Sequence, residues 1–167
     1  MRYSCGSVEE DASGGSSMQA YDDFLDRVRD IHRIGALQGH LGWDQEVLMP
    51  PKGGAARSEM MAWLAGQRHQ RLTDPAMGTL LDELEQTSLE VDAQANVREI
   101  RRAYTKACCL PSAFVEAFAK ARSEALMAWQ QAREASDFSM FQSTLEHLID
   151  MTRQKISYYG VTTTPYD

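Results

Sequence analysis

The chain has 167 residues, the size of one compact domain, and 43% of them are hydrophobic while 25% are charged. These proportions match those of average soluble globular proteins and exclude a wholly disordered chain. The net charge of −7 argues against a nucleic acid or an anionic membrane surface as the main partner, because both attract basic proteins.

Cysteine usage and hydropathy indicate the compartment. The three cysteines, Cys5, Cys108 and Cys109, cannot form a disulfide framework, which is typical of a reducing compartment. No apolar run approaches the roughly 18 residues that span a bilayer. Residues 1–17 contain one early Arg but lack the apolar region of a secretory signal. We therefore expect a cytoplasmic protein that binds neither membranes nor nucleic acids.

The chain divides into a short tail and one helical domain. Residues 1–17 are rich in Ser, Gly and acids, which predicts a disordered polar tail. Residues 18–167 predict a helical domain, whose first helix begins near Ala20 and repeats apolar residues at helical spacing. Two prolines and two glycines in residues 48–54 should end this helix. Its apolar stripe consists of Phe24, Val28, Ile31, Leu37 and Leu41.

Caps and apolar stripes predict five further helices. A second helix covers about residues 55–71, a third begins with Asp74 as N-cap and Pro75 at the first position, and a fourth covers about residues 92–109. Pro111 opens a fifth, and a sixth runs from a cap at Asp137 to a stop at Gly160. Residues 161–167 are predicted to be β-rich or extended. The fold class is all-α, with about six amphipathic helices. Their apolar positions are Met60, Met61, Trp63 and Leu64; Met77, Leu80, Leu81 and Leu84; Val97, Ile100 and Tyr104; Phe114, Phe118, Ala121, Ala125 and Trp129; and Phe141, Leu145, Leu148, Thr152, Ile156 and Tyr159.

The sequence lacks the local motifs of a self-sufficient active site. No histidine is followed by Glu, which excludes the His-Glu-x-x-His zinc motif, and no Glu has a His three residues later, as a di-iron bundle requires. A P-loop, a dinucleotide-binding glycine motif and a Gly-x-Ser-x-Gly elbow are also absent. We therefore assign no catalytic, cofactor-binding or metal residue.

Several weaker patterns have a plainer structural interpretation. His40 with Asp44 and His147 with Asp150 are isolated pairs, which are more often hydrogen-bonded partners than metal ligands. Cys108 and Cys109 are expected to be structural thiols, which are more often buried than reactive. A solvated face of paired charges is expected for Asp22, Asp26 and Asp30 with Arg27, Arg29 and Arg33. A basic face paired with neighbouring acids is expected for residues 96–106. Packing within and between helices is expected for Trp43, Trp63 and Trp129 with the nine methionines.

One segment is more specific than a generic helix. Residues 41–51 read Leu-Gly-Trp-Asp-Gln-Glu-Val-Leu-Met-Pro-Pro, and Gly53 and Gly54 follow. This segment resembles the signature near the start of the Taq-type metal-dependent carboxypeptidases. Further blocks follow in that family's order: Arg57 and Glu59, residues 64–66, His69 with residues 71–75, residues 96–102 with Tyr104, Leu110-Pro111, residues 123–125 with Trp129, Asp137-Phe138 and residues 165–167.

The resemblance implies a largely helical, zinc-dependent exopeptidase that removes residues from peptide C-termini, and a possible homodimer. Family members are considerably longer, so residues 18–167 are expected to be incomplete at their C-terminal end. The family's zinc-binding motif has no counterpart here, so no bound zinc and no activity are expected of this chain alone. Trp43 is expected to fill a gap, and Asp44 or Gln45 to bond exposed backbone groups at the Pro-Gly break. The alternative is a non-catalytic helical interaction module that kept the scaffold without the chemistry.

Overall fold

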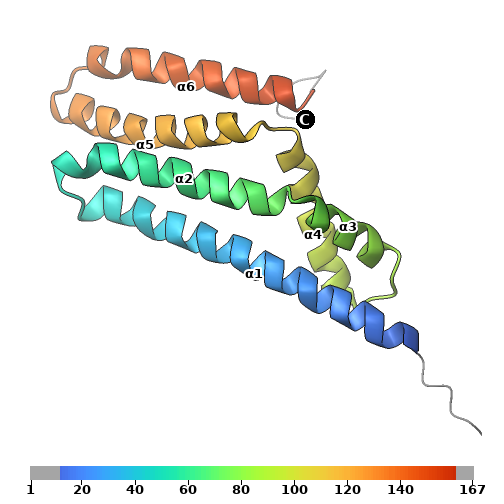
Figure 1. Cartoon of the computed structure of the whole chain (residues 1–167). Helices are drawn as coiled ribbons and strands as arrows, with labels where there is room; N and C mark the ends of the chain where they lie inside the picture. Colours follow the sequence, from blue (N-terminus) through green and yellow to red (C-terminus); the bar gives the residue numbers. More distant parts are fainter. Residues whose placement is uncertain (1–11, 161–167) are drawn as a thin grey trace, which may run out of the picture.

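The computed structural model describes residues 12–160, and their side chains from Met18 onward. Every regular element in this part of the chain is helical, as the sequence predicts (Figure 1). The elements are α1 (Ala12–Val47), the 3₁₀ turn η1 (Pro51–Gly53), α2 (Gly54–Leu72), α3 (Pro75–Glu85), α4 (Val91–Cys108), α5 (Ser112–Glu134) and α6 (Ser139–Tyr158).

Four of the helices form one layer. α1, α2, α5 and α6 lie side by side in that order, each antiparallel to the next, while α3 and α4 lie beside the N-terminal half of α1 (Figure 1). A single layer of helices has two broad faces. This part of the chain covers them only partly, which determines where its apolar side chains are exposed.

The main hydrophobic core lies where α1 meets α3 and α4. Phe24 and Ile31 of α1 are buried there, as their helical spacing predicts. The fully buried positions of α3 and α4 also follow the predicted stripes, whereas Leu80, Ile100 and Tyr104 pack around them partly exposed. The complete buried cluster is Ala20, Phe24, Ile31, Met77, Leu81, Leu84 and Val97.

The centre of the layer is held together differently, by close approach of α2 and α5. A Cβ atom on Gly54 would overlap the end of the Met127 side chain, and one on Gly66 would overlap the carboxylate of Glu116. Lys120 of α5 forms an ion pair with Glu59 between these two points. Glycine at these two positions therefore lets the side chains of α5 lie close against α2, and a larger residue would require Met127 or Glu116 to move.

Most predicted helix ends are confirmed. The Asp74 side chain accepts a hydrogen bond from the Ala76 amide at 2.8 Å, with Pro75 in the first turn. Asp137 accepts from the Ser139 amide at 2.9 Å at the start of α6. Gly160 has a φ of +63° just after α6, a conformation that glycine adopts without strain.

The start of α1 differs from the sequence expectation. The helix begins at Ala12 rather than near Ala20, so it includes a Ser- and Gly-rich stretch that composition assigns to the polar tail. A helix anchored by a packed core extends at low cost per residue, because only its first turn is expensive to form. The rest of the predicted tail, residues 1–11, and the predicted extended end, residues 161–167, lie outside the described residues.

Candidate functional site

The signature segment, residues 41–51, ends α1 and forms the turn into α2. Arg57 of α2 donates hydrogen bonds to the Leu41 carbonyl and to the Asp44 carboxylate. The Asp44 main-chain oxygen accepts from the amides of Leu48 and Met49 at 2.9 and 2.8 Å, which closes the helix end. The guanidinium of Arg57 therefore fixes the end of α1 against the start of α2.

Gln45 fastens the same segment to α5, 78 residues further along the chain. Its amide donates to the Ser123 carbonyl at 2.9 Å, and the Ser123 hydroxyl donates to Gln45 Oε1 at 3.0 Å. Only 5% of Gln45 and 6% of Ser123 are exposed to solvent. The expectation that Asp44 or Gln45 bonds free backbone groups at the Pro-Gly break is therefore wrong, because their side chains bind α2 and α5 instead.

A groove of about 470 Å³ lies beside this bond. We call it the signature groove, because Gly42, Gln45 and Glu46 of the signature line one side of it. Helix α5 contributes Arg122 and Trp129 to its opposite side, and the other contributing elements are α2 and α6. It is the concave surface that the signature helps to build.

The three tryptophans correct a sequence expectation. They are not buried in the described part of the chain: Trp43 is 57%, Trp63 is 63% and Trp129 is 45% exposed. Exposed Trp is costly in water, and clusters of such residues usually mark an interaction surface. A helical stripe shows which face is apolar, but it does not show whether this chain or another part of the protein covers that face.

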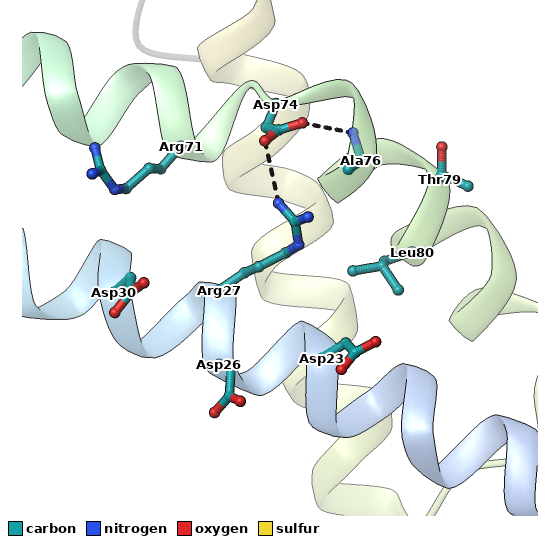
Figure 2. A pocket seen from close by; sticks show the side chains of 9 residues that line it. All are labelled: Asp23, Asp26, Arg27, Asp30, Arg71, Asp74, Ala76, Thr79 and Leu80. Atoms are coloured by element: carbon teal, nitrogen blue, oxygen red, sulfur yellow. Dashed lines mark hydrogen bonds and ion pairs between the residues drawn. The ribbon is translucent and has the colours of Figure 1, made fainter.

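A concavity of about 740 Å³ lies between α1 and α3 (Figure 2). Its central contact is a 3.2 Å ion pair between Arg27 and Asp74. The Ala76 amide, and then Arg27, hold the pKa of Asp74 below its usual 3.8. Asp26 and Asp30 pair with Arg29 and Arg33 one turn away. The expected solvated, paired face is confirmed: the Arg27–Asp74 pair links α1 to the start of α3, and the other two pairs lie within α1.

The remaining candidate residues lie apart from one another. His40 is exposed and makes no hydrogen bond to Asp44, whose partner is Arg57, while His147 and Asp150 are exposed on α6. In the basic stretch, residues 96–106, Arg101 pairs with Asp82 and Glu85 of α3, as expected of a face paired with neighbouring acids. Cys108 and Cys109 are exposed, so the expectation that they are buried is wrong.

A zinc site does not fit the described residues. Catalytic zinc takes three protein ligands, and the described part of the chain contains no cluster of three His, Cys, Asp or Glu side chains that could hold a metal ion. His69, the one buried histidine among the described residues, has its pKa lowered from 6.5 by burial, against smaller opposing effects of the Leu110 carbonyl and Glu116. None of the helices described here combines the length and the hydropathy that a bilayer-spanning segment needs.

Residues 23–167 match the family described as carboxypeptidase Taq (M32) metallopeptidase, and the chain belongs to this family. It is 36% identical over 140 residues to thermostable carboxypeptidase 1 of Thermus thermophilus and 31% identical over 144 residues to the Pyrococcus furiosus protein of the same name. These matches cover 81% and 86% of the chain, but only 28% and 29% of those relatives.

The fold matches solved structures to the same extent. The crystal structure of BsuCP superimposes with a TM-score of 0.86 at 27% sequence identity, over 89% of this chain and 30% of that one. Trypanosoma cruzi metallocarboxypeptidase 1 gives a TM-score of 0.65 at 32% identity. The chain therefore corresponds to an N-terminal portion of these longer proteins, and the resemblance that the signature indicated is confirmed.

Proposed function

We propose that this chain is the N-terminal scaffold of a zinc carboxypeptidase that hydrolyses C-terminal residues from peptides. The observation that carries the proposal is the agreement of fold and sequence with metallocarboxypeptidases over nearly all of the described residues. In this proposal α1, α2 and α5 form part of one wall of the substrate cleft. Every zinc ligand and the catalytic base lie in the portion of the family that follows the region matched here.

The exposed tryptophans favour this proposal over a free-standing interaction module. A module that folds by itself should cover most of its large apolar side chains, whereas a scaffold portion leaves them exposed for the rest of the protein. Trp43, Trp63 and Trp129 follow the second pattern, and they lie on three different helices. Homodimerisation and a cytoplasmic location remain part of the proposal, inherited from the family and from composition respectively.

The test compares the chain alone with the chain completed. Purified chain, incubated with zinc and then desalted, should retain well under one zinc per molecule and release no C-terminal amino acid from a blocked dipeptide. A chimera that joins this chain to the part of the Thermus thermophilus relative beyond its matched region should do both. Stoichiometric zinc in the isolated chain, with hydrolysis that a chelator stops, would overturn the proposal, and so would a folded, zinc-loaded chimera without peptidase activity.

A further inference from the structure

The signature groove has the properties of a preformed docking surface. Its walls come from four helices, and the buried Gln45–Ser123 hydrogen bonds fix α1 and α5 relative to each other. Trp129 lines the groove while nearly half exposed. A partner that enters this groove therefore buries a large aromatic side chain without first having to order the surface.

Gly42 leaves room for a partner to approach α1 at the groove. Glycine inside a helix costs about 1 kcal/mol relative to alanine, and its missing side chain allows another backbone or side chain to come near. A Cβ atom on Gly42 would meet nothing within 4 Å in this chain. The space that the missing side chain leaves is open to the groove, so no residue described here explains the glycine.

The lining of the groove carries both signs of charge. Glu46 of α1 and Arg122 of α5 line it, both are exposed, and neither forms an ion pair within residues 18–160. Apolar side chains together with unpaired charges are typical of a protein–protein contact. The surface fits a helix or loop that carries apolar side chains and complementary charges.

The length of the related proteins limits what that partner can be. This chain matches 28–30% of the length of its relatives, and the family match continues to residue 167. Each relative therefore carries more than twice as much further protein, for which the present chain has no counterpart. In such a protein the layer of four helices meets the further portion on one of its faces, and the signature groove is a concavity on one such face.

We infer that the signature groove is the docking surface for the remaining, C-terminal portion of a carboxypeptidase Taq protein. The occupant is a segment of that portion, which packs against Gly42 and Trp129. This inference rests on the proposed function, since it names the partner that completes the scaffold. The inference places the contact on one face of the layer. Trp63 lies away from that face, because it is two residues, and so roughly 200° around α2, from Met61, which lines the groove.

Two variants form a matched pair on one helix. Gly42→Gln places a side chain in the groove, while Gly39→Gln places the same side chain one turn earlier, at a position that does not line the groove. A Cβ atom at either position meets nothing within 4 Å, so both isolated variants should melt at or above the wild-type temperature. Trp129→Ala and Trp63→Ala form a second pair, inside and outside the groove.

The assay measures capture of the C-terminal portion of Thermus thermophilus thermostable carboxypeptidase 1, co-expressed without its own matched region. That protein's own N-terminal portion serves as the positive control. The wild-type chain and Gly39→Gln should capture the C-terminal portion. Gly42→Gln should raise the Kd about tenfold or more, because overpacking a close contact weakens binding by that order. Trp129→Ala should weaken capture more than Trp63→Ala does.

The outcomes are decisive in either direction. Equal capture by both glycine variants would overturn the inference. Capture by the positive control but not by the wild-type chain would overturn it as well. So would light scattering that shows the chain associating with itself through the groove. If the C-terminal portion is insoluble when separate, the same variants are compared in the joined chimera, where Gly42→Gln alone should lower the melting temperature. Docking without zinc-dependent peptidase activity would refute the proposed function while the groove assignment stands.

Discussion

Replacing Gln45 by Ala should cost the isolated chain about 2–3 kcal/mol of unfolding free energy. Gln45 makes two hydrogen bonds to Ser123, and a net contribution of about 1 kcal/mol each is typical. The Ser123 hydroxyl would remain buried without its partner, which adds about 1 kcal/mol. The loss is large because α1 and α5 are joined here by a polar contact rather than by a broad apolar one.

Urea unfolding followed by circular dichroism measures this loss. With a slope of about 2 kcal/mol per molar urea, the midpoint should fall by about 1–1.5 M. Gln142→Ala, which removes an exposed Gln bonded to Glu146 on α6, is the matched control and should change stability by less than about 0.5 kcal/mol.

A double-mutant cycle with Ser123→Ala tests the reasoning itself. The two single changes remove the same hydroxyl–amide bond, so their effects should fall short of additivity by about 1 kcal/mol. Additive effects would refute the argument, because they would mean that the bond between the Ser123 hydroxyl and the Gln45 amide contributes no stability. A Gln45→Ala loss no larger than that of Gln142→Ala would refute it as well.

Three further changes test other parts of the structure. Gly78→Ala should destabilise the chain by about 1–3 kcal/mol in urea unfolding, because the new Cβ would lie 2.5 Å from Tyr104 Oη. Adding Tyr104→Phe should restore part of this loss. Gly39→Ala is the control and should not lower the stability of the chain. Arg57→Ala should lower the unfolding free energy by about 2 kcal/mol in the same assay, since the Leu41 carbonyl and the Asp44 carboxylate both lose a charged donor. Arg153→Ala, which removes an exposed ion pair, is the control and should lower it by less than about 0.5 kcal/mol. The melting temperature should fall as the pH drops below 6.5, because burial lowers the pKa of His69 and the unfolded chain therefore binds the proton first. His69→Gln should make the melting temperature depend less steeply on pH. An unchanged pH dependence would contradict the lowered pKa of His69.

Local signals in the sequence predict local structure well. The third helix begins at Asp74-Pro75 as expected, because the cap and the proline act on neighbouring backbone groups. Gly160 ends α6 for a similarly local reason, its positive φ. The all-α class follows from the helical spacing of apolar residues, which holds over most of the chain.

Local signals do not predict contacts between segments that are far apart in the sequence. Gln45 and Ser123 are 78 positions apart, and nothing in either segment indicates the other. Trp43, Trp63 and Trp129 were expected within the packing, because a stripe identifies an apolar face without showing what covers it. The motif at residues 41–51 identified the family, yet its roles in joining α1 to α2 and α5 required the structure.

The most direct test of the central claim is zinc-dependent release of C-terminal residues, measured for the chain alone and for the chimera completed with the Thermus thermophilus C-terminal portion. We predict that the chain alone shows no release above background and that the chimera shows release which a chelator abolishes and zinc restores. Release of C-terminal residues by the chain alone, abolished by a chelator, would contradict the claim that this portion is scaffold and that the chemistry lies in the rest of the protein.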